Sequence, residues 1–250
     1  MIKIHPFFCY DRNMNNILSN PFLSCFLTYT VNIIILAAML IIARFLFHPP
    51  RELFRKMLHL VAFTSTAFIV AYAKNWQAAA WTMVLFALIV WPVLKFFERF
   101  SWYSDLFIER RAGEIKNSLL LLFLSQAAFV TLCWGILGDR WMAALATVAW
   151  GVGDAMAALV GKRFGKHHTN IPLADQKKTW EGTFAMFVSA FLVYVIGLSL
   201  LSNLSLGRIL LRSIFAAAVN AYVELITKNG NDTITVPISG ILVLWLFSLL

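Results

Sequence analysis

The chain has 250 residues, of which 60% are hydrophobic and only 13% are charged, and its formal net charge is +9. An apolar fraction this high is rare in soluble domains, so the composition indicates an integral membrane protein. The positive charge does not predict a nucleic-acid partner, because basic loops beside anionic lipid account for it. Cys9, Cys25 and Cys133 have no paired spacing that would predict a zinc site or a disulfide framework.

Long apolar segments predict an all-α polytopic protein with about eight transmembrane helices, since a helix needs about 20 apolar residues to cross a bilayer. We expect a single membrane domain over residues 1–250, with a polar N-terminal tail at 1–20. The tail lacks the compact apolar run and cleavage site of a removable signal peptide. In chain order, the expected spans cover residues 23–45, 57–73, 76–97, 117–137, 141–161, 182–204, 208–227 and 234–250.

Lysine and arginine are distributed unevenly over the loops between these spans. The first, third, fifth and seventh loops hold 15 of the 21, whereas the N-terminal tail and the other loops hold six. The positive-inside rule therefore places the odd-numbered loops in the cytoplasm and both termini on the opposite side. The polar motifs follow the same alternation, so a nucleotide is expected to bind at the cytoplasmic face.

The fifth expected span contains an acidic residue, Asp154. An ionisable group inside a membrane span is costly and usually functional, so we predict a functional carboxylate, with metal binding as its leading role. Gly151, Ala158 and Gly161 share its helical face by spacings of three and four residues. A seam of small residues for helix packing accounts for the glycines and alanines, but it does not account for Asp154.

A basic, glycine-spaced segment follows Asp154, in which Lys162, Arg163 and Lys166 alternate with Gly161 and Gly165. Glycine allows a tight turn that brings backbone N–H groups near an anion, and the basic side chains supply charge to a phosphate. The Gly-Lys-Ser/Thr of a P-loop is absent from the sequence. Anchoring of the basic side chains to lipid head groups explains the segment equally well.

The sixth expected span opens with Lys177, Lys178, Thr179 and Glu181. Thr179 is expected to be the N-cap, and Glu181 suits the positive end of the helix dipole. The two lysines oppose that dipole, and an anion bound at the helix N-terminus would resolve the conflict.

Further polar residues fall in loops on the same side. Interfacial anchoring, solvation, helix-end ion pairing or turn formation would explain each of them alone. Their shared side of the membrane is the reason to retain them as candidates. They are Arg55, Lys56, His59, Arg111, Glu114, Glu224, Asn231 and Asp232.

Taken in order, these segments resemble motifs of the CTP-dependent lipid kinases, which include dolichol kinase, phytol and farnesol kinases and CTP-dependent diacylglycerol kinase. That family belongs to a broader superfamily with phosphatidate cytidylyltransferase. Asn231 stands where the family pattern has Asp, and Thr233 stands where it has Asn, which leaves Asp232 as the acidic residue of that segment. The similar segments are 55–59, 111–114, 153–157, 161–166, 178–183 and 231–237.

The resemblance implies an all-α membrane enzyme that transfers the γ-phosphate of CTP to the hydroxyl of a membrane lipid alcohol, with Mg²⁺ as its divalent cation. It implies that Asp154 and Asp232 hold the metal, and that Asp154, Lys178 and Glu181 are catalytic. Glu181 would orient or deprotonate the acceptor hydroxyl. The nucleotide-binding residues that it implies are Gly153, Gly161, Lys162, Arg163, Gly165, Lys166, Lys177 and Thr179.

Three other functions compete with this interpretation. Cytidylyl transfer to phosphatidate is one, although the Lys-Asp and His-Gly-Gly…Asp-Arg-x-Asp runs typical of that enzyme are missing from the sequence. A transporter would use Asp154 and Glu224 as ion-coupling carboxylates, but the sequence has no recognisable internal repeat. A catalytically inactive scaffold is the third, and the Asn231 departure keeps it open.

Overall fold

The computed structural model describes residues 20–101, 103, 113–169, 178–228 and 230–249. Within these ranges the regular structure is helical, apart from one isolated antiparallel bridge between His168 and Thr179. The predicted all-α architecture is therefore confirmed. Two candidate site residues, Arg111 and Lys177, and the tail at 1–19 lie outside the described residues.

The helices match the predicted spans closely, and most ends differ by three residues or fewer. Seven of the described helical segments are long and apolar enough to cross a membrane, and α10 is a shorter apolar helix. The described helices are α2 (Pro21–Phe47), α3 (Arg51–Tyr72), α4 (Trp76–Phe97), α6 (Glu114–Val130) with the π-helical η1 (Thr131–Ile136), α7 (Met142–Phe164), α8 (Trp180–Leu201), α9 (Leu206–Ile226) and α10 (Asp232–Ser248).

Polar side chains cap the N-termini of several of these helices by accepting hydrogen bonds from backbone N–H groups that have no partner within the helix. Asn20 caps α2 by accepting a hydrogen bond from Phe22 N at 2.9 Å, and Asn75 caps α4 by accepting one from Ala78 N at 2.8 Å. The predicted N-cap of α8 is confirmed, because Thr179 Oγ1 accepts a hydrogen bond from the backbone N–H of Gly182 at 3.2 Å.

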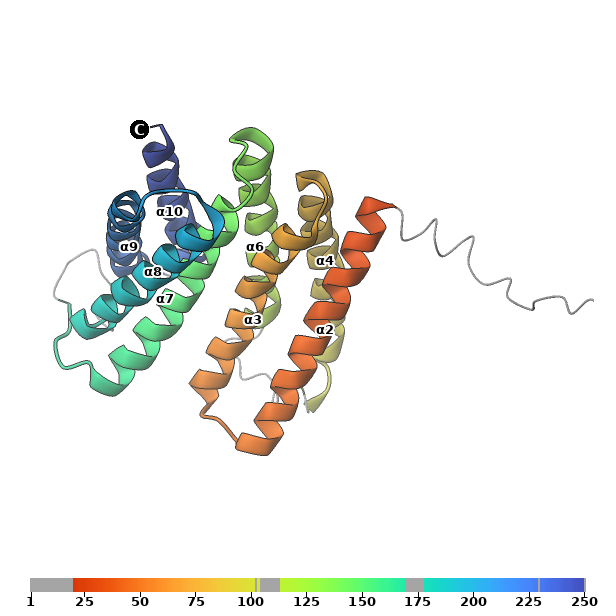
Figure 1. Ribbon diagram of the computed structural model, residues 1–250. Coiled ribbons are helices and arrows are strands. Elements are labelled where there is room, and N and C mark those ends of the chain that lie inside the picture. Colours follow the sequence, from red (N-terminus) through yellow and green to blue (C-terminus); the bar gives the residue numbers. More distant parts are fainter. Residues whose placement is uncertain (1–19, 102, 104–112, 170–177, 229, 250) are drawn as a thin grey trace, which may run out of the picture.

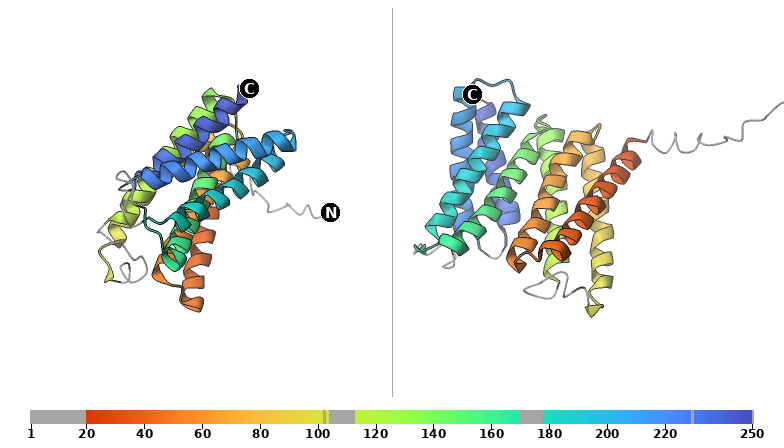
Figure 2. Two further views of the ribbon diagram at one scale, coloured as in Figure 1. Left: turned by 90° about the vertical axis from the view of Figure 1, so that its left-hand side faces the viewer. Right: turned by 60° about the horizontal axis from the view of Figure 1, so that its bottom comes forward.

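The bundle has two parts that meet along α7. Helices α2, α3, α4 and α6 form one part and α7 to α10 form the other (Figures 1 and 2). Helix α7 packs on α3, α8 and α10, and its first half is almost entirely buried. Large apolar side chains such as Ile34, Leu88 and Leu200 remain exposed on the outside, as expected for helices that face lipid.

Consecutive helices run in opposite directions, which brings their polar ends together. The starts of α3, α6, α8 and α10 and the ends of α7 and α9 share one end of the bundle. Helix α2 begins, and α10 ends, at the opposite end (Figure 1). The alternation inferred from the basic loops is thus reproduced by the helix directions.

Helix α7 continues past the point at which a phosphate-binding turn was predicted, so that prediction is wrong for Gly161 to Arg163. These residues are helical, and α7 ends at Phe164. A Cβ atom at Gly161 would lie 3.1 Å from Thr179 Oγ1 and 3.6 Å from Gly182 Cα. The glycine therefore lets α7 and α8 approach closely, which extends the helix by packing instead of opening a turn.

At the end of the bundle opposite the polar helix ends, Arg140 joins η1 and α7 to the end of α3. Its guanidinium donates to the carbonyl oxygens of Val70 at 2.6 and 2.8 Å, and of Ala71 and Ala73 at 2.8 Å each. It also lies over the ring of Trp134, 4.5 Å from the centroid. The last carbonyls of a helix lack intrahelical partners, so this arginine terminates α3.

Candidate active site

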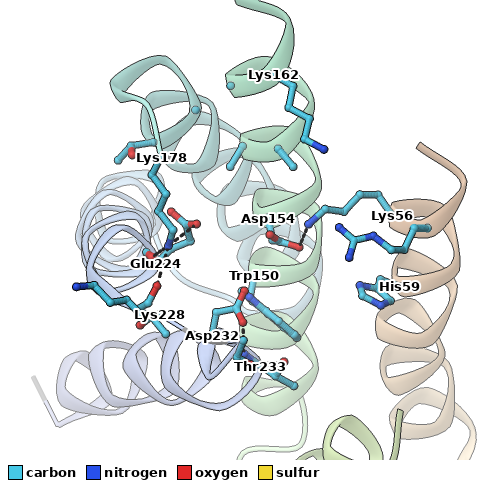
Figure 3. A pocket seen from close by; sticks show the side chains of 18 of the residues that line it. Lys56, His59, Trp150, Asp154, Lys162, Lys178, Glu224, Lys228, Asp232 and Thr233 are labelled. Carbon is cyan, nitrogen blue, oxygen red and sulfur yellow. Dashed lines mark hydrogen bonds and ion pairs between the residues drawn. The ribbon is translucent and has the colours of Figure 1, made fainter. Parts of the chain in front are cut away.

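Six helices surround one cavity of about 640 Å³ at the polar end of the bundle (Figure 3). Both signs of charge line it, which is unusual inside a membrane bundle and indicates function. The lining cations are Arg55, Lys56, Lys162, Lys178 and Lys228, and the lining carboxylates are Glu114, Asp154, Glu224 and Asp232.

Asp154 lies on the central helix, where it faces α3 across the cavity (Figure 3). Its Oδ2 is 2.5 Å from Nζ of Lys56, and both side chains are mostly buried, with 16% and 11% exposure. The lysine therefore compensates the carboxylate that the sequence places inside a membrane span. Trp150 and Gly161 share the cavity face of α7 with Asp154, as spacings of four and seven residues require.

Lys178 binds the end of α9. Its Nζ lies 3.0 Å from Glu224 Oε1 and 3.0 Å from the carbonyl oxygen of Thr227, and it also donates to the carbonyl of Glu224. The C-terminal carbonyls of a helix attract cations. The end of α9 thus compensates Lys178, whose charge opposes the dipole of its own helix.

Asp232 is the first residue of α10, and it lies within electrostatic reach of Asp154, Lys56 and Lys178. Its Oδ1 accepts from the backbone N–H of Thr233 at 3.1 Å, and among the described residues it forms no ion pair. Two neighbouring carboxylates with one shared lysine repel each other, and a cation placed between them would relieve that repulsion.

The described residues contain no group of three or more His, Cys, Asp or Glu side chains arranged to hold a metal ion. Mg²⁺, however, usually binds proteins through one or two carboxylates and completes its shell with water and substrate phosphate oxygens. Asp154 and Asp232, both lining the cavity and lying near each other, fit that donor set.

The candidates from the first and third loops also reach the cavity. Arg55 Nη1 lies 3.1 Å from Glu114 Oε1, and this ion pair connects α3 to α6. His59, one turn further along α3, lines the same wall and packs near Phe63, with ring centroids 6.0 Å apart. Segments that are separate in the sequence therefore contribute to one site.

Glu181 lies outside the cavity lining. Its carboxylate accepts from the backbone N–H groups of Lys166 at 3.1 Å and His167 at 3.2 Å, and it contacts His167 Nδ1 at 2.7 Å. These contacts hold the segment that follows α7 against the start of α8. Its position gives no support to the predicted contact with an acceptor hydroxyl.

Four other predicted site residues also lie outside the lining. Gly153 is buried against α8, where a Cβ atom would overlap Met186, because one step along a helix turns a residue away from the Asp154 face. Arg163 lies over the ring of Phe164, 5.4 Å from its centroid. The others are Lys166, an exposed residue, and Asn231.

An apolar floor, which the sequence reasoning missed, closes the cavity toward the middle of the bundle. It consists of Phe63, Leu119, Leu122 and Trp150, and the Phe63 and Trp150 rings lie 4.4 Å apart. Phe63 is eight residues beyond Arg55, so it lies about 12 Å further along α3 than that rim residue. The spacing of four residues between Trp150 and Asp154 was the available signal.

Several known proteins that are similar in sequence to this chain are named as lipid kinases. The chain is similar to the phytol kinase of Synechocystis sp., with 29% identity over 206 residues that cover 78% of this chain and 79% of the relative. It is similar to a probable phytol kinase of Glycine max, with 28% identity over 153 residues, 58% of this chain and 48% of the relative. A dolichol kinase of Schizosaccharomyces pombe is 49% identical over 43 residues, 17% of this chain and 8% of the relative. No family model and no solved structure matches.

Proposed function

The chain belongs to the lipid kinase family that contains phytol kinase and dolichol kinase, and on that premise we propose that it transfers the γ-phosphate of CTP to the hydroxyl of a membrane lipid alcohol. Phytol, the acceptor named for two of the similar proteins, is the first acceptor to test. Polyprenols and diacylglycerol are the alternatives.

One observation carries the proposal: a single cavity combines a charged rim with an apolar floor inside a membrane bundle. A kinase for lipid alcohols must bring a polyanionic donor and an amphiphilic acceptor into contact. The rim offers cations to the donor phosphates, and the floor offers apolar surface to the carbons next to the acceptor hydroxyl. A purely ion-coupled transporter would not require both surfaces.

The charged residues of the rim divide into two roles. Asp154 and Asp232 would hold Mg²⁺, which when bound neutralises charge on the donor phosphates. Lys178 and Lys162 would bind the phosphates, because phosphoryl transfer depends mainly on positioning and charge neutralisation. Lys56, already paired with Asp154, keeps that carboxylate in place beside the phosphates.

We also propose that the cavity opens at the cytoplasmic face, as the distribution of basic residues indicates. Labelling with a membrane-impermeant thiol reagent tests this sidedness. A cysteine introduced at Lys166 should react only from the cytoplasm, and one introduced at Ser205 only from the other side. The reverse pattern would overturn the assignment.

The decisive assay uses protein purified in detergent–lipid micelles with Mg²⁺ and phytol, polyprenol, diacylglycerol or phosphatidate. Parallel reactions contain CTP labelled on the γ-phosphate or on the α-phosphate. We expect γ-label in a lipid product, and removal of the divalent cation by a chelator should abolish it. Transfer of α-label to phosphatidate would instead establish cytidylyl transfer. Absence of both labels, with other nucleotides also inactive, would contradict enzymatic function.

A further inference from the structure

The indole N–H of Trp150 is a buried donor that has no partner in the described part of the chain. Trp150 is only 2% exposed, and its Nε1 has no hydrogen-bond acceptor among the described residues. Buried donors in native proteins are almost always paired, because an unpaired one loses its interaction with water and gains nothing in return. An acceptor beyond the described residues is therefore expected at this nitrogen, and its position in the cavity lining makes a ligand the natural candidate.

Trp150 lies where the charged rim meets the apolar floor. It is four residues before Asp154 on the cavity face of α7, about 6 Å deeper along the helix. Lys162 lies eight residues beyond Asp154 in the other direction, about 12 Å toward the end of the helix. Figure 3 shows the indole beneath Asp154 with its nitrogen on the side of Asp154 and Asp232.

Packing holds the indole in this place. The ring of Phe63 lies against it, with centroids 4.4 Å apart and planes inclined at 47°. The next residue, Gly151, has no side chain, and a Cβ atom there would overlap the Phe63 ring. The glycine thus allows α3 to approach α7 closely, so that Phe63 supports Trp150 and the N–H keeps its direction.

We propose that Trp150 Nε1–H donates a hydrogen bond to the hydroxyl oxygen of the acceptor alcohol, and that Phe63 and Trp150 form the wall that packs against its first carbons. This inference rests on the function proposed above. It makes Trp150 the residue that sets how deeply the alcohol enters the cavity.

A hydroxyl suits this donor better than a phosphate oxygen does. The phosphates carry charge, and the rim cations Lys162 and Lys178 would bind them more strongly than a neutral N–H would. Trp150 lies deeper than Asp154 and belongs to the floor, where a charged oxygen would lose its solvation. A lipid alcohol suits the boundary between the rim and the floor, because its hydroxyl can accept from the indole N–H while its apolar chain packs against the floor.

The test compares Trp150→Phe, which keeps an aromatic ring but removes the donor, with Trp76→Phe as a matched control. Trp76 packs against Gly135 at the other end of the bundle. Wild type and control should be stabilised against heat more by phytol than by phytane, the hydrocarbon that lacks the hydroxyl. Trp150→Phe should lose that difference, and its KM for phytol should rise about tenfold, as expected for one hydrogen bond.

Each alternative role gives a different result. A rise in the KM for CTP with an unchanged KM for phytol would assign the N–H to a phosphate oxygen and overturn the proposal. A changed Mg²⁺ requirement alone would assign it to a carboxylate and would also overturn it. If wild type transfers no γ-label, the proposed kinase function fails, whereas the phytol–phytane comparison still tests the hydrogen bond.

A second measurement does not depend on folding of Trp150→Phe. In wild-type protein labelled with ¹⁵N on its nine tryptophans, one indole N–H resonance should shift when phytol is added and stay in place with phytane. That resonance should be the one most perturbed in Phe63→Leu. A phytol response in none of the nine resonances would overturn the proposal.

Discussion

The two ends of α7 both carry charged residues, but the fold satisfies them in different ways. Before the start of α7, Asp139 accepts from the backbone N–H groups of Trp141 and Met142 at 2.9 and 3.0 Å, and Arg140 binds backbone carbonyls of α3. Toward the other end, Asp154 is paired with a side chain, that of Lys56. Asp139 and Arg140 pair with backbone groups and complete helix ends, whereas the pair of Asp154 and Lys56 lies in a cavity, where its side chains can exchange partners with a ligand.

The largest expected effect comes from Asp154→Asn. The amide keeps the shape of the side chain but removes the charge that would hold Mg²⁺, so γ-phosphate transfer should fall by about 100-fold or more. Asp139→Asn, near the other end of the same helix, is the matched control, because Asn also serves as a helix cap. Initial rates with labelled CTP measure the transfer. Equal activity of the two variants would show that the two ends of α7 do not differ in their role.

Lys178→Met is expected to have the next largest effect. The ammonium group holds Glu224 and the end of α9, and it would also contact phosphate, so the kcat/KM for CTP should fall about 10- to 100-fold. The variant should also be less stable, since Glu224 would be left buried without its partner.

Adding Glu224→Gln to Lys178→Met tests the structural part of this effect. The double variant should recover thermal stability, because the uncompensated carboxylate is gone, without recovering the rate. Lys74→Met, an exposed lysine at the other end of the bundle, provides the control. Full recovery of activity in the double variant would show that Lys178 acts only through Glu224.

Arg140→Met should affect stability and leave catalysis unchanged. The guanidinium donates to three backbone carbonyls at the end of α3, and its loss should cost about 2 kcal/mol of unfolding free energy. The KM values for CTP and lipid should remain those of wild type once the protein is folded. A thermal unfolding series in detergent, with kinetics measured well below the transition, separates the two effects. A raised KM for CTP would show that the two ends are coupled.

The smallest effect is expected from Gly161→Ala. The added methyl group approaches Thr179 Oγ1 and the α8 backbone, so stability should change by about 1 kcal/mol or less. Because Gly161 is helical, its substitution should not raise the KM for CTP. A tenfold rise in that KM would instead support the phosphate-binding turn that the sequence suggested, and would contradict the packing role.

Much of the fold was predictable because it depends on local properties. Helix number and position follow from the lengths of apolar segments, and the Thr179 cap follows from side-chain chemistry. Asp154 was identifiable because a carboxylate inside a span is costly whatever surrounds it. The turn at Gly161 was mispredicted, since the local sequence does not reveal that α8 packs on the glycine and extends the helix.

The sequence by itself determined which residues are available at the polar end of the bundle: Asp154, Asp232 and the lysines, placed there by the alternation of basic loops. Only the tertiary structure decided their partners. Lys56 and Asp154 are 98 residues apart, and Lys178 and Glu224 are 46 apart. Helical periodicity relates residues within a few turns, whereas contacts between helices depend on how the helices rotate and pack against one another. The spacing of four residues puts Trp150 on the same face of α7 as Asp154, but only the packing of Phe63 from α3 against its ring made it part of the cavity floor.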